Sequence, residues 1–125
     1  MNVIRVAAVL LCGVFTAAFA QDALVGKYTG HRTGERGGPR ATELEIVSAE
    51  GSKVKATLTR YGGRSYSCGG ATPMEGTYTG NTLELSTVKT PDLIAGCETN
   101  LTVTLTGNKL TGTIGPNKRN LELSK

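Results

Sequence analysis

The stretch Leu101-Thr102-Val103-Thr104-Leu105-Thr106 alternates apolar side chains with threonines. Successive side chains of a β-strand point to opposite faces, so the apolar residues would line one face and the threonines the other. The pattern therefore predicts a half-buried strand. We expect Leu101, Val103 and Leu105 in the core, with Thr102 and Thr104 facing water.

The same alternation occurs on both sides of this stretch. Residues 53–60, Lys-Val-Lys-Ala-Thr-Leu-Thr-Arg, repeat it, and the short runs Leu83-Glu84-Leu85 and Leu121-Glu122-Leu123 place a glutamate between two leucines. We expect these four leucines to be buried and Glu84 to be exposed. The turn pairs Glu50-Gly51, Gly80-Asn81 and Gly107-Asn108 each separate two strand-like runs, which predicts antiparallel hairpins.

An internal repeat extends the pattern along the chain. Gly26-Lys27-Tyr28-Thr29-Gly30 recurs as Gly76-Thr77-Tyr78-Thr79-Gly80, and Gly112-Thr113-Ile114 is a shorter third copy. This order predicts an all-β fold, a small antiparallel up-and-down meander barrel of about eight strands; a two-sheet β-sandwich is the alternative. The Gly-x-aromatic unit resembles strands of the lipocalin and avidin families. That resemblance implies the barrel architecture and no ligand or site.

The N-terminus has the layout of a secretory signal peptide over residues 1–20. Arg5 precedes an apolar run from Val6 to Phe15, and Ala18-Phe19-Ala20 predicts cleavage before Gln21. The apolar run is shorter than the roughly 20 residues that cross a bilayer, so we expect no membrane span. Residues 21–125 would then form a single secreted or periplasmic domain. Without Arg5 the formal net charge of +4 falls to +3, a mild preference for anionic partners.

Cys68 and Cys97 remain after cleavage, whereas Cys12 leaves with the signal. An even pair in an oxidising compartment predicts one disulfide. No histidine or carboxylate cluster with metal-ligand spacing accompanies the two cysteines, so we expect no metal site and no cofactor.

Two segments concentrate cationic and aromatic side chains. Residues 31–40 hold His31, three arginines and three glycines, and we interpret them as a loop that joins the first two strands. Residues 60–70 interleave two arginines with two tyrosines beside Cys68. Arginine pairs with carboxylate, sulfate and phosphate groups, and Tyr and Arg dominate many interfaces. The candidate binding residues are Arg32, Arg36, Arg40, Arg60, Tyr61, Arg64 and Tyr66. The alternative is that these segments only solubilise the domain.

The expected mature chain has few side chains that could act as a general acid or base, because it contains one histidine and two aspartates, Asp22 and Asp92. We therefore expect no enzyme. The leading hypothesis is a secreted binding module for an anionic glycan or a protein, and the sequence carries no specific nucleic-acid signal. Two alternatives stay open: a hydrolase inhibitor acting through Arg64, Ser65 and Tyr66, and a carrier that holds a small molecule inside the barrel. The sequence leaves the oligomeric state open.

Overall fold

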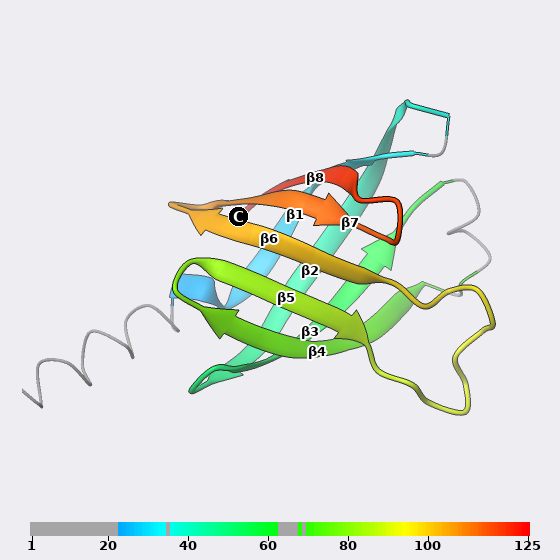
Figure 1. The fold of residues 1–125 in the computed structure, drawn as a ribbon. Helices are drawn as coiled ribbons and strands as arrows, with labels where there is room; N and C mark the ends of the chain where they lie inside the picture. Colours follow the sequence, from blue (N-terminus) through cyan, green and yellow to red (C-terminus); the bar gives the residue numbers. More distant parts are fainter. Residues whose placement is uncertain (1–22, 35, 63–67, 69) are drawn as a thin grey trace, which may run out of the picture.

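The computed structural model describes residues 23–34, 36–62, 68 and 70–125. Eight antiparallel strands follow one another in chain order and close into a barrel, with β8 paired to β1 (Figure 1). The strands are β1 (Gly26–Thr33), β2 (Pro39–Glu50), β3 (Lys53–Arg60), β4 (Ala71–Thr79), β5 (Thr82–Thr87), β6 (Asn100–Thr106), β7 (Lys109–Ile114) and β8 (Arg119–Ser124). The predicted eight-stranded meander barrel is confirmed, and the two-sheet alternative is not the fold formed. The expected signal peptide and its cleavage site lie outside the described residues.

Alternation along the strands builds the core. One face of each strand points inward, and the inward aliphatic side chains pack into a single cluster with Tyr28. As predicted, Leu83, Leu85, Leu101, Val103, Leu121 and Leu123 are buried, and Thr102, Thr104 and Glu84 are exposed. Leu105 is half-buried at the strand end and packs against this cluster. The parity of the threonine-rich strands therefore sets which residues face the interior.

Each copy of the repeat carries a glycine at an inward position where two strands approach closely. A Cβ atom at Gly30, Gly76 or Gly112 would overlap the backbone of the neighbouring strand; at Gly76 the atom met is the Glu84 carbonyl oxygen. Adjacent strands approach closely at these points, as they do at the tight bends of a barrel. The glycines thus allow a small sheet to close.

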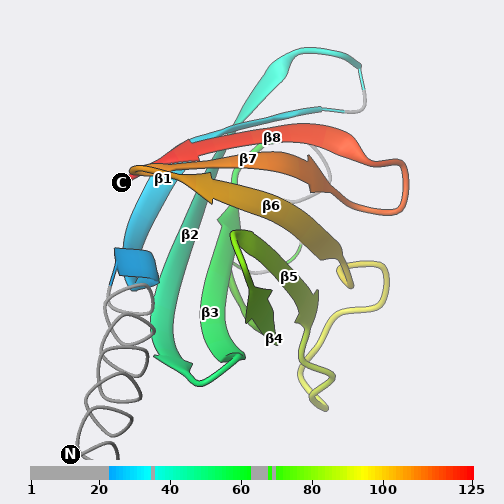
Figure 2. The same cartoon turned by 60° about the vertical axis from the view of Figure 1, so that its left-hand side comes forward.

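The two ends of the barrel differ. At one end β2–β3, β4–β5 and β6–β7 are joined by two-residue turns, and Gly80 and Gly107 have the left-handed φ values of 63° and 62° that such turns require. Leu24 is fully buried at this end, where its carbonyl accepts a 2.7 Å hydrogen bond from the Tyr28 hydroxyl. The longer connections all lie at the other end, beyond β1, β3, β5 and β7 (Figures 1 and 2). The first end is closed and the second is available for a site.

The predicted disulfide is confirmed: Cys68 and Cys97 are bonded, with their Cα atoms 5.7 Å apart. The bond joins the β3–β4 connection to the β5–β6 connection at the long-loop end. Over the described ranges, no helix has the length and apolar character needed to cross a membrane.

Candidate functional site

A cavity of about 620 Å³ opens at the long-loop end of the barrel. Its wall comes from strand ends and connections that are distant in sequence, and the Cys68 disulfide and Ile114 supply less polar surface. Arginine is the most frequent residue in the lining. The five that contribute are Arg32, Arg36, Arg40, Arg60 and Arg119.

Four of these arginines continue the inward-facing rows of the core. Arg60 stands two residues after buried Leu58, and Arg119 stands two residues before buried Leu121. Arg40 and Arg32 hold the same inward parity on β2 and β1, where buried Thr42 and Tyr28 share their faces. The strands that carry them, β8, β1, β2 and β3, are consecutive neighbours around the barrel. A cationic layer therefore lies directly above an aliphatic core.

Arg32 is the most buried of the five, with 8% of its surface exposed. Its Nη1 donates to the Ala41 carbonyl at 3.0 Å and to Thr42 Oγ1 at 2.9 Å. Its Nη2 donates to the carbonyls of Tyr61 at 3.1 Å and Gly62 at 3.4 Å. These bonds fasten β1 to β2 and to the end of β3. Arg32 thus contributes positive charge to the cavity, while its Nη donors are directed at the protein.

Within the described chain, Arg60 and Arg119 each donate one side-chain hydrogen bond, and both residues line the cavity. Arg60 Nη2 donates to the Cys97 carbonyl at 2.8 Å, and Arg119 Nη1 donates to the Gly34 carbonyl at 2.7 Å. Each bond joins a strand end to a connection on another side of the mouth. Held in this way, a guanidinium group loses less conformational freedom when it meets a ligand.

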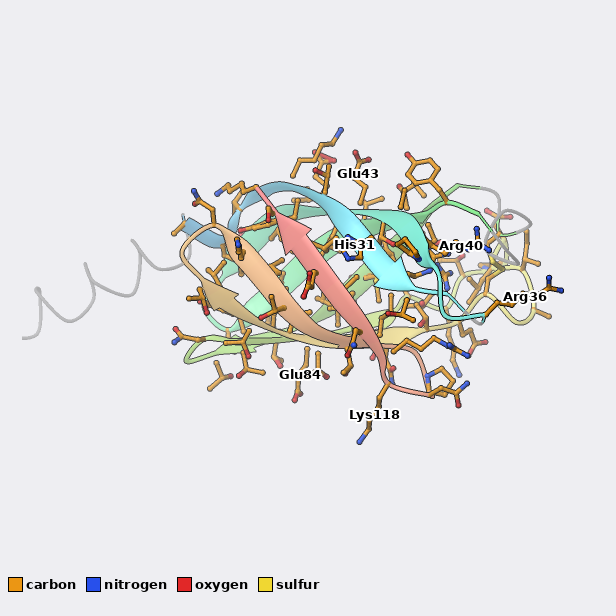
Figure 3. The ribbon with its side chains drawn as sticks, turned by 90° about the horizontal axis from the view of Figure 1, so that it is seen from above. His31, Arg36, Arg40, Glu43, Glu84 and Lys118 are labelled. Carbon is orange, nitrogen blue, oxygen red and sulfur yellow. A yellow bond between two sulfur atoms is a disulfide. The ribbon has the colours of Figure 1, made fainter. Side chains whose placement is uncertain are left out.

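The side chains of Arg36 and Arg40 make no hydrogen bond or ion pair with any part of the chain that the structure describes. The aliphatic stem of Arg40 runs against Gly34 and Gly62, where a larger residue would crowd it. Figure 3 shows Arg36 and Arg40 at the long-loop end, away from Glu43 and Glu84 on the barrel wall. These two side chains can offer whole guanidinium groups to a ligand.

Positive charges outnumber negative charges among the described residues that line the cavity. Arg32 and Arg40 are directly paired across β1 and β2, a placement that disfavours like charges. Burial, together with the charges of Arg60 and Arg40, lowers the pKa of Arg32, and burial lowers the pKa of Arg60. Glu98 is the one carboxylate among the described lining residues. The ion pairs of the described chain, Lys27–Glu43 and His31–Glu122, involve outward-facing residues.

This repulsion leads to a prediction on the ligand-free protein. Arg40→Gln keeps most of the aliphatic stem and removes one of two facing charges, so the variant is expected to melt at a higher temperature than the wild type in low-salt buffer. The gain should shrink as salt screens the charges. Lys55→Gln, an equal charge change on the wall of β3, is the control. A lower melting temperature for Arg40→Gln than for the control would contradict the repulsion.

The structure brings together four of the residues predicted from the sequence: Arg32, Arg36, Arg40 and Arg60. Tyr61 is exposed and meets the site through its backbone carbonyl, while Arg64 and Tyr66 lie outside the described residues. His31 points outward, with its Nε2 3.7 Å from Glu122 Oε2. Sequence reasoning missed Arg119 and Glu98. The parity of Arg119 with Leu121 was a usable signal for an inward side chain, whereas Glu98 lies in an irregular connection and gave none.

The predicted loop over residues 31–40 is shorter in the structure. β1 continues to Thr33 and β2 begins at Pro39, so only 34–38 connect them. At the mouth of the barrel both faces of a strand carry polar side chains. A prediction based on alternating hydrophobicity therefore does not detect these strand ends. The consequence is that Arg32 and Arg40 are held by a ladder of backbone pairs.

Within the described chain, no group of three or more His, Cys, Asp or Glu side chains could hold a metal ion. Comparison with models of protein families, with curated proteins and with solved structures finds no match to this chain.

Proposed function

We propose that this protein is a secreted, non-enzymatic binding module that captures an anionic ligand in the arginine-lined cavity at the barrel mouth. The observation that carries the proposal is the convergence of five arginines, with a single described carboxylate, on one cavity of about 620 Å³. Arginine offers paired N–H donors that match carboxylate, sulfate and phosphate oxygens. A bound anion would neutralise charges that repel one another in the free protein.

The hydrogen bonds of the site support binding over a purely structural role. Arg32, Arg60 and Arg119 fasten the rim, and this use alone would explain them. Arg36 and Arg40 fasten nothing in the described chain, yet they line the same cavity. Locally unfavourable charge placements are characteristic of functional sites, where a ligand supplies the missing partner.

The barrel centre is a poorer candidate for the ligand. Seventeen hydrophobic residues of the described chain are buried, and most of them pack into one core cluster between the strands. A bound small molecule is therefore expected at the mouth of the barrel, where the lining is polar, and not at its centre.

The test compares a cavity variant with a variant of equal charge. Arg36→Gln/Arg40→Gln is expected to elute from a sulfated-polysaccharide column at clearly lower salt than the wild type, because each charge-assisted bond contributes roughly 1.5–3 kcal/mol. Lys53→Gln/Lys55→Gln, at the opposite end of β3, should elute close to the wild type. Equal elution of the two double variants would show that net charge, not the cavity, governs retention.

Salt dependence separates this proposal from the inhibitor hypothesis. Ligand retention through exposed arginines should weaken steeply with rising ionic strength, whereas a loop packed into a hydrolase cleft should tolerate salt. A wild-type protein that inhibits a hydrolase equally well in low and high salt, with no loss in Arg36→Gln/Arg40→Gln, would replace the proposal by that alternative.

A further inference from the structure

The arginine cavity has a second wall of different chemistry. Its arginines come from β8, β1, β2, β3 and the β1–β2 connection, while Glu98, Thr99 and Asn117 line it from the β5–β6 and β7–β8 connections. These three residues carry no positive charge, because their side chains are a carboxylate, a hydroxyl and an amide. Such groups pair with ligand hydroxyls, which both donate and accept hydrogen bonds. The cavity therefore has an anion-binding side and a hydroxyl-binding side.

The second wall is shared with another depression. A shallower hollow of about 290 Å³ lies over the ends of β5 and β6, and Glu98, Thr99 and Pro116 line both hollows. The remaining lining of the second hollow is polar as well: Ser86, Thr87, Lys89 and Asn100. The two hollows therefore adjoin at Glu98, Thr99 and Pro116, and Lys89 brings a further cation to the second hollow.

The size of the first cavity argues against a simple inorganic anion as its ligand. A water molecule occupies about 30 Å³ of the liquid, so the first cavity alone has the volume of roughly twenty waters. A sulfate ion would contact a few arginine donors and leave most of the space hydrated. A longer ligand would displace that water and reach the polar groups of the second hollow.

We infer that the ligand is an acidic oligosaccharide. One of its anionic groups lies among the arginines, and its next sugar unit lies over the second hollow, which Ser86 and Asn100 help to line. This inference rests on the proposed function and adds the ligand class and a second subsite. Sugar hydroxyls face Glu98, Thr99 and Asn100, and a second acidic group lies toward Lys89. The described lining of both hollows offers hydrogen-bonding groups and no aromatic ring on which a nucleobase could stack.

Calorimetric titration of the purified protein at constant ionic strength tests the inference, with sodium sulfate, glucose 6-sulfate and a sulfated tetrasaccharide cut from heparin. The wild type should bind the tetrasaccharide at least about tenfold more tightly than sulfate. Asn100→Ala should lower tetrasaccharide affinity by about 3- to 10-fold, the effect of one neutral hydrogen bond, and leave sulfate affinity unchanged. Asn120→Ala, an exposed asparagine of β8 outside both hollows, is the matched control.

Glu98→Gln tests the hydroxyl-binding wall by comparing two anions. Removing the carboxylate should raise the affinity for sulfate by a few-fold, because a like charge is lost, and should raise the affinity for glucose 6-sulfate less or lower it, because a strong hydroxyl acceptor is weakened at the same time. An equal rise for both ligands would overturn the hydroxyl-binding wall and keep the anion site.

The remaining outcomes are distinct. If sulfate and the tetrasaccharide bind equally tightly, the oligosaccharide inference fails and the proposed function stands. If no anion binds, both fail. A single-stranded oligonucleotide that binds more tightly than the tetrasaccharide, without a loss in Asn100→Ala, would overturn the inference in favour of nucleic acid.

Discussion

Replacing both Cys68 and Cys97 by alanine is expected to lower the free energy of unfolding by about 3–4 kcal/mol. The two cysteines are separated by 29 residues, and the chain-entropy model assigns this much to closing a loop of that length. A small domain has only about 5–15 kcal/mol of stability, so the change is a large part of the total. Urea denaturation followed by circular dichroism measures it.

The same change should weaken anion binding. The Cys97 carbonyl accepts the bond that anchors Arg60, and Cys68 lines the cavity. Reducing the wild-type disulfide should therefore reproduce both effects of the double alanine variant. An unfolding midpoint that does not move in either experiment would show that the barrel holds its ends without the bond.

The second large effect is expected for Gly76→Ala, which should lose about 2–3 kcal/mol of stability. The new Cβ atom would overlap the Glu84 carbonyl oxygen of β5, and that backbone cannot move without disturbing the β4–β5 ladder. The loss is steric, because Gly76 does not have the left-handed φ that would favour glycine. An alanine at an unconstrained strand position would instead be mildly favourable relative to glycine.

Gly38→Ala is the matched control for this steric argument. Nothing lies within 4 Å of a Cβ atom built at Gly38, and its φ is not left-handed. Its unfolding midpoint in urea should match the wild type or exceed it slightly. If Gly76→Ala and Gly38→Ala unfold at the same urea concentration, the close approach of β4 and β5 does not limit the fold.

Local patterns determined most of the barrel. Period-two alternation identifies the inward residues of a strand wherever one face is apolar, as in 101–106. A dipeptide that contains glycine indicates a two-residue turn, because few other residues adopt the dihedral angles that such a turn requires. The disulfide followed from the cysteine count and the expected compartment. Val47 is an exception: it is 57% exposed beside the register shift in the β2–β3 pairing, and nothing in its apolar side chain predicts that position.

The candidate site depended on how the ends of the sheet meet. Arg32 and Arg119 are far apart in sequence, and they share one cavity because closure pairs β8 with β1. Alternation predicts that each arginine shares a face with a core residue, yet it does not say which strands are neighbours or where the interior ends and the mouth begins. Glu98 belongs to an irregular connection whose path is set by the disulfide and by contacts with the strand ends. The sequence by itself determined the strands, the core and the cysteine pair; the tertiary structure decided that the inward arginines form one cationic cavity, because barrel closure is a long-range property.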